Sequence, residues 1–153
     1  MDIELLYEIR NEIQGNMCIE ELDEKEALQI IDVVAKKHIK DRSRVWWWEG
    51  LNSKPSVIEY GDGFSWPMIR DMIKNDNQLV YLFVTDDEPE PWPVFRGTLH
   101  DIGILLAGMW RFEYFLSDKY FSWLIFDTHH NDLLVAGGLS DRAVGFAKND
   151  EYN

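Results

Sequence analysis

The chain has 153 residues, of which 46% are hydrophobic and 14% aromatic, a composition that excludes a disordered or fibrous protein and indicates one compact domain. Its 28 acidic residues outnumber the 15 basic ones, and the net charge of −13 opposes binding to nucleic acid or to an anionic membrane. We therefore expect any charged partner to be basic. Solubility alone is the alternative reason for the acidic charge.

The sequence carries no sign of export or of an oxidising compartment. Cys18 is the only cysteine, which excludes an internal disulfide and a cysteine-based zinc site. The N-terminus lacks the pattern of a signal peptide, and no stretch approaches the roughly 18 apolar residues of a membrane span. We expect a cytoplasmic protein with a single domain over residues 1–153 and no cofactor.

Two helices are predicted in the first quarter of the chain. Residues 3–14 place apolar side chains at every third or fourth position and predict a short amphipathic helix closed by Gly15. Asp23 and Glu26 form a capping pair for a second helix, which extends to about Lys40. The basic residues at its end complement the helix dipole, and a phosphate-binding patch is the alternative.

The middle of the chain alternates between extended and helical patterns. Residues 45–48 and 56–60 are rich in Trp, Val and Ile and predict two strands that form a hairpin or an edge pair. Ser65 and Pro67 mark the start of a short helix. Residues 79–84 are apolar at every position, which predicts a central strand covered on two sides.

A proline-rich segment, residues 86–95, follows this strand and is predicted to be a loop; we call it the acidic loop. Thr98 and Asp101 then form a capping box for a helix that reaches about Gly108. This helix precedes the most strand-rich part of the chain.

Three further strands are predicted over residues 111–117, 122–127 and 132–136, and their spacing indicates an antiparallel meander. Because strands and helices do not alternate strictly, the order of elements favours an α+β fold. We expect a largely antiparallel sheet with helices packed on one face and a C-terminal β-meander. Residues 139–153 are expected to form a loosely ordered tail, with one helical turn near residues 143–148.

One group of residues could bind a metal or transfer protons. Asp127, His129, His130 and Asp132 lie within six residues at the predicted turn between the last two strands. Neighbouring histidines in an extended chain point to opposite faces, and their spacing does not match the usual zinc motifs. Asn131 and Asp132 are also typical turn residues, so a plain turn is the competing interpretation.

Other enzyme signatures are absent from the sequence. It contains no nucleophile elbow and no phosphate-binding glycine loop. Carboxylates follow Cys18 closely and would raise the pKa of its thiol, which disfavours a nucleophilic role. The Trp46–Trp48 run could stack on bases, but a nucleic-acid platform needs a basic groove, which the overall charge disfavours. We therefore expect a protein that is not an enzyme.

The acidic loop is the strongest candidate for a binding site. Asp86, Asp87, Glu88 and Glu90 would attract a basic partner, and three prolines stiffen the loop and reduce the entropy lost on binding. Trp92 has the side chain most typical of an interface anchor. The alternative is a solvated connection with Trp92 folded back into the core.

The helical start, the Trp-rich strands, the mixed α/β body and the acidic surface together resemble the small acidic immunity proteins that bacteria carry against toxins, and loosely the SMI1/KNR4 group. The resemblance spans most of the chain and rests on the order of elements. It implies stoichiometric binding of a basic toxin domain in the cytoplasm, without catalysis. A small metal-binding protein or hydrolase that uses His129 and His130 is the alternative, and a module that dimerises through a sheet edge is a third.

Overall fold

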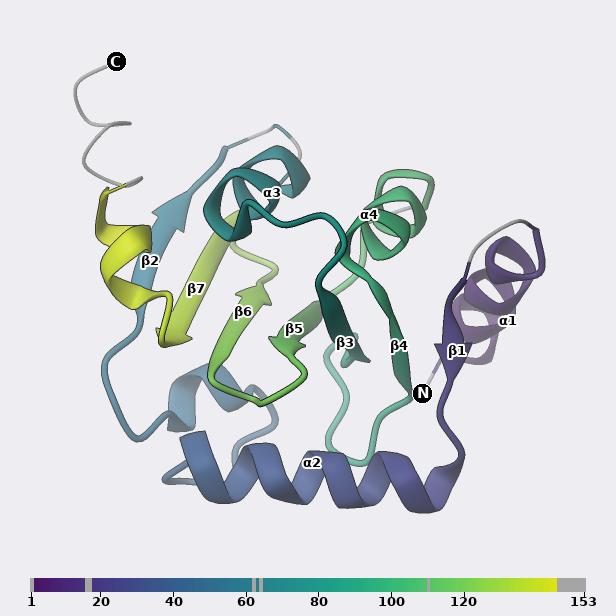
Figure 1. Ribbon diagram of the computed structural model, residues 1–153. Coiled ribbons are helices and arrows are strands. Elements are labelled where there is room, and N and C mark those ends of the chain that lie inside the picture. Colours follow the sequence, from purple (N-terminus) through teal and green to yellow (C-terminus); the bar gives the residue numbers. More distant parts are fainter. Residues whose placement is uncertain (1, 16–17, 62, 64, 110, 146–153) are drawn as a thin grey trace.

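A computed structural model describes residues 2–15, 18–61, 63, 65–109 and 111–145 (Figure 1). Within these residues, seven strands form one antiparallel sheet in the order β1-β4-β3-β5-β6-β7-β2. The strands are β1 (Glu20–Glu21), β2 (Ser56–Glu59), β3 (Leu79–Val84), β4 (Val94–Thr98), β5 (Tyr114–Asp118), β6 (Trp123–Asp127) and β7 (Asp132–Gly137). The helices are α1 (Ile3–Ile13), α2 (Glu24–His38), α3 (Trp66–Ile73), α4 (Leu99–Ala107) and the 3-10 helix η1 (Trp47–Gly50). The α+β class and the antiparallel sheet are confirmed, and β5, β6 and β7 form the expected meander.

Helices cover both faces of the sheet, which corrects the expectation that they pack on one. Side chains of α1, α3 and α4 share one core cluster with half of the strand residues, and α2 and η1 share a second cluster with the other half. Figure 1 shows α2 on the opposite side of the sheet from α3 and α4. The physical reason lies in β5 and β6, where every position is buried. Successive residues of a strand point to opposite faces of the sheet. Because odd and even positions of β5 and β6 are both buried, helices must cover both faces.

The predicted strand at residues 45–48 is wrong, because the chain forms η1 at this place. Trp47 is buried in the second core cluster, and the backbone then returns to meet the end of α2. The carbonyl of Gly50 accepts hydrogen bonds from the backbone N–H groups of Lys40 and Asp41, at 2.7 and 3.0 Å. A Cβ at residue 50 would lie 2.3 Å from the carbonyl oxygen of Asp41, so only glycine permits this close approach.

Strand β4 occupies residues that the sequence interpretation assigned to the end of the acidic loop and to the start of a helix. It pairs with β3 on one side and with the two-residue edge strand β1 on the other. The strand runs directly into α4, whose N-cap is Thr98, and the Thr98 hydroxyl accepts a hydrogen bond from the Asp101 N–H at 3.2 Å. The Thr98 half of the predicted capping box is therefore confirmed, although no loop separates strand and helix. The Asp101 carboxylate accepts a hydrogen bond from the Cys18 backbone N–H, at 3.2 Å.

The described C-terminal residues are packed against the sheet. Residues 140–145 are helical, and Ala143 is buried in the same core cluster as α1, α3 and α4. The guanidinium of Arg142 donates a hydrogen bond to the carbonyl of Met72 in α3 at 2.7 Å. The remainder of the expected tail, residues 146–153, lies outside the described residues. Within the described part of the chain, no helix has the length and apolar character needed to cross a membrane.

Candidate functional site

The acidic loop lies against the body of the protein, and its tryptophan is in the core. The Trp92 side chain is 3% exposed, and its Nε1–H donates a hydrogen bond to the Glu88 carbonyl at 2.8 Å. The indole meets the Trp47 ring edge-on with ring centroids 4.7 Å apart. Trp92 is therefore folded back into the core, which was the alternative interpretation, and it is not an exposed anchor for a partner.

The carboxylates of the acidic loop are partly engaged within the fold. Arg42 binds Glu90 through two nitrogens, with Nη2–Oε1 at 2.7 Å and Nε–Oε2 at 2.9 Å. Asp86 is half-buried, and burial raises the pKa of its carboxyl. Asp86 and Asp87 both have left-handed backbone conformations, with φ of 43° and 61°. This double turn carries the Asp87 side chain toward the segment that precedes β5.

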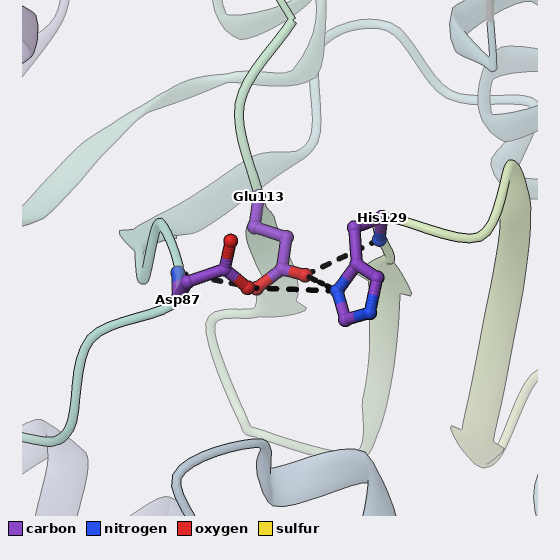
Figure 2. A group of neighbouring side chains, drawn as sticks. All are labelled: Asp87, Glu113 and His129. Carbon is purple, nitrogen blue, oxygen red and sulfur yellow. Dashed lines mark hydrogen bonds and ion pairs between the residues drawn. The ribbon is translucent and has the colours of Figure 1, made fainter.

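Three side chains from distant segments meet at this point (Figure 2). Glu113 immediately precedes β5, Asp87 belongs to the acidic loop, and His129 belongs to the turn between β6 and β7. His129 Nδ1 lies 2.5 Å from Glu113 Oε2 and 3.5 Å from Asp87 Oδ1. The backbone N–H groups of Asp87 and His129 also donate to the Glu113 carboxylate, at 3.3 and 3.2 Å. The two regions singled out in the sequence, the acidic loop and the histidine turn, are therefore joined through Glu113.

Glu113 is 5% exposed, and burial raises the pKa of its carboxyl, while the hydrogen bond with His129 acts in the opposite direction. A carboxylate in such a place needs a compensating positive charge or hydrogen-bond donors. Sequence reasoning missed Glu113 because a single glutamate beside a strand carries no motif. The available signal was a charged residue between Phe112 and Tyr114 in an otherwise apolar segment.

Two indoles border this cluster. The Trp46 Nε1–H donates a hydrogen bond to Asp87 Oδ1 at 2.9 Å, and the Trp46 and Trp48 rings stack with centroids 5.8 Å apart. The His129 ring centroid lies 5.1 Å from that of Trp46 and 5.7 Å from that of Trp48. The tryptophan run therefore holds one side of the cluster and contacts its histidine.

The residues of the predicted histidine group do not form one site. Asp127 is 4% exposed and accepts hydrogen bonds from the hydroxyls of Tyr60 and Ser65, at 2.5 and 2.6 Å. Burial raises its pKa, which the two hydrogen bonds oppose. Asp132 accepts a hydrogen bond from the Thr128 hydroxyl. Asp127 and Asp132 therefore do not join the histidines in one site, because Asp127 ends β6 facing Tyr60 and Ser65, whereas His129 and His130 lie in the turn that follows the strand.

The polar group around Asp127 borders a cavity of about 190 Å³ on the side of the sheet covered by α3 and α4. Its walls include Trp66, Phe112 and Tyr114, and Arg111 stands at its edge with Nη2 3.7 Å from Asp127 Oδ1. Ser65 is the N-cap of α3 but makes no capping hydrogen bond with its side chain, since its hydroxyl donates to Asp127. These hydrogen bonds tie the start of α3 to the end of β6.

A further acidic surface lies around α1. Nine of the chain's 28 acidic residues fall within residues 2–26, against the two basic residues Arg10 and Lys25. Ile3 and Tyr7, one helical turn apart on α1, are 82% and 64% exposed. Their neighbours Glu4 and Glu8 are exposed and form no ion pair with any other described residue. Figure 1 places α1 beside the edge strand β1, and Arg10 of α1 lines a surface pocket together with residues 91–94 of the acidic loop.

A protein-family model matches residues 7–145, and its description is Family of unknown function (DUF6756). The chain belongs to the DUF6756 family. The match contains Asp87, Glu113 and His129 together with the cavity beside Asp127, so these features are part of the DUF6756 domain. No curated protein and no solved structure matches the chain.

Proposed function

We propose that this DUF6756 protein is a non-enzymatic acidic binding protein of the immunity or antitoxin type, which neutralises a basic toxin domain by stoichiometric binding. The observation that carries the proposal is the acidic surface around α1. There, Ile3 and Tyr7 are exposed on α1. Their neighbours Glu4 and Glu8 form no ion pair with another described residue, whereas other carboxylates of this surface, Glu20, Glu21 and Glu26, pair with arginines.

Such a surface has the two components of a binding site for a basic protein. Carboxylates accelerate encounter with a basic surface and disfavour acidic competitors. Exposed apolar and aromatic side chains supply the area that is removed from water on contact, and tyrosine is among the residues most enriched at the centres of interfaces. If the toxin binds nucleic acid, these carboxylates would contact the basic residues of the toxin that otherwise contact phosphate groups.

The acidic loop is a second place where a basic partner could bind. Its carboxylates Asp86, Asp87, Glu88 and Glu90 were the candidates from the sequence, but Glu90 is held by Arg42 and Asp87 by Trp46. Breaking these contacts would oppose binding, since each leaves a charge or a donor without its partner. Binding through Glu4 and Glu8 on α1 breaks no ion pair with another described residue, which favours this surface over the loop.

Co-expression tests the proposed function. The resemblance to immunity proteins implies that a toxin gene lies next to the gene for this protein. The neighbouring gene is induced in a bacterial host with and without this protein, and growth is measured. We expect growth arrest from the neighbour alone and recovery when this protein is present.

A double variant that removes the apolar pair, Ile3→Ser with Tyr7→Ser, should reduce this recovery, whereas Tyr120→Ser, which changes an equally exposed aromatic residue outside α1, should not. Circular dichroism of both purified variants verifies their folding. A neighbouring product that does not arrest growth, or an arrest that this protein fails to relieve, would contradict the immunity function.

A further inference from the structure

We propose that Asp87, Glu113 and His129 form a binding site for a divalent transition-metal ion. This site goes beyond the proposed interaction with a basic protein, because none of its residues belongs to α1. One ligand atom of each side chain, a carboxylate oxygen or an imidazole nitrogen, lies within 4.8 Å of the other two. The three side chains point toward a common point in Figure 2.

The separations between the ligand atoms are close to those that a metal needs. Bond lengths of about 2.1 Å to nitrogen and oxygen in a tetrahedral site place neighbouring ligand atoms about 3.4 Å apart. His129 Nδ1 and Asp87 Oδ1 are already 3.5 Å apart. His129 Nδ1 and Glu113 Oε2 are 2.5 Å apart, a hydrogen-bond distance, so this pair has to open by about 1 Å.

The metal would take the place of a proton. In the hydrogen bond between His129 and Glu113 a proton lies between Nδ1 and the carboxylate. Coordination through Nδ1 requires this proton to leave, either to solvent or through a change of tautomer to Nε2. The positive charge of the ion then compensates both carboxylates, including the buried one of Glu113.

The ligand set defines the class of ion. One imidazole and two carboxylates suit Zn²⁺, Mn²⁺, Fe²⁺ and Co²⁺ better than the soft cations that prefer thiolate. Three protein ligands leave at least one position for water. The ion would therefore be bound reversibly and remain accessible from the side of the exposed His129 ring.

Surrounding groups hold two of the ligands in place. The Trp46 indole donates its N–H to Asp87 Oδ1, and the backbone N–H of His129 donates to Glu113 Oε2. Hydrogen bonds of this kind orient ligands in known metal sites, and their loss typically costs about 10-fold to 100-fold in metal affinity. The left-handed turn at Asp86 and Asp87 also fixes the direction of the Asp87 side chain.

Isothermal titration calorimetry of the full chain with ZnCl₂ after treatment with a chelator tests the proposal. We expect one ion per chain. Glu113→Gln keeps the size of the side chain and an acceptor for His129, yet it removes the charge, so it should weaken Zn²⁺ binding by about 10-fold or more. Asp87→Asn should act in the same direction, and because Asp87 is exposed, this variant is expected to fold normally.

The neighbouring residues supply matched controls. His130 adjoins His129 but is not part of the cluster, so His130→Ala should bind Zn²⁺ as the wild type does. Asp86→Asn changes the other left-handed aspartate of the same turn and should also leave binding unchanged.

Titration with Co²⁺ gives an independent readout, because a paramagnetic ion at His129 should quench the fluorescence of Trp46 and Trp48. Trp46→Phe should lose part of this quenching.

Two results would overturn the proposal. The first is absence of stoichiometric binding of Zn²⁺, Mn²⁺ and Co²⁺ to the wild type. The second is binding that Glu113→Gln and Asp87→Asn leave unchanged, or that His130→Ala weakens as much as His129→Ala does.

Discussion

Glu113 shows at the scale of single residues how a cluster of polar side chains can depend on a residue that no sequence pattern identifies. Its carboxylate joins the acidic loop to the histidine turn, two segments 42 positions apart at Asp87 and His129. The sequence pointed to both segments separately because carboxylates and histidines in turns are visible as residue types. Their meeting depends on strand pairing and on the left-handed conformation of two aspartates, which only the folded chain specifies.

Trp92 provides a test of the buried position of the acidic loop. We predict that Trp92→Ala lowers the free energy of unfolding by about 3 to 5 kcal/mol, because it removes a buried indole and leaves a cavity. Urea denaturation followed by circular dichroism measures this change. Tyr120→Ala, at a residue 69% exposed, should change the free energy by less than about 0.5 kcal/mol. Equal, small effects of both substitutions would mean that the Trp92 indole is not part of the core.

Local signals predicted most of the secondary-structure elements. Apolar periodicity identified α1 and α2, and the capping residues Asp23 and Thr98 both accept the hydrogen bonds expected of them. The Trp46–Trp48 run was misassigned because a short apolar run is compatible with a strand or with a buried turn, and here Trp47 enters the core from a 3-10 helix. Strand β4 was missed because the prolines before it dominated the local pattern.

Two adjacent valines of α2 test whether this helix covers the second face of the sheet. Val34 is fully buried and Val33 is 46% exposed. We predict that Val34→Ala destabilises the protein by about 2 kcal/mol through lost burial and a residual cavity. Val33→Ala removes the same atoms from the solvent side and should change stability by less than about 0.5 kcal/mol. Chemical denaturation of both variants measures the difference, and indistinguishable midpoints would contradict the packing of α2 described above.

At the scale of the whole molecule, helices cover both faces of a seven-stranded sheet formed by the described residues. Asp127 at the end of β6 bonds to Ser65, and His129 just beyond it bonds to Glu113. The α+β class followed from the order of elements. The apolar run at residues 79–84 already predicted that β3 is covered on two sides, which the expectation of helices on one face did not take into account. The acidic charge and its concentration within residues 2–26 are visible in the sequence, whereas the exposure of Ile3 and Tyr7 among these carboxylates required the fold.

Calorimetric titration of this protein with the product of the neighbouring gene tests the central claim most directly. It compares the wild type with two neutralised variants: one with Glu4→Gln and Glu8→Gln on α1, the other with Asp86→Asn and Glu88→Gln in the acidic loop. We predict one-to-one binding that weakens as salt rises from about 50 to about 500 mM, because screening reduces the attraction between opposite charges. The α1 variant should bind more weakly and with a smaller dependence on salt than the loop variant. Absence of binding, or binding that neither salt nor the α1 substitutions change, would contradict the account.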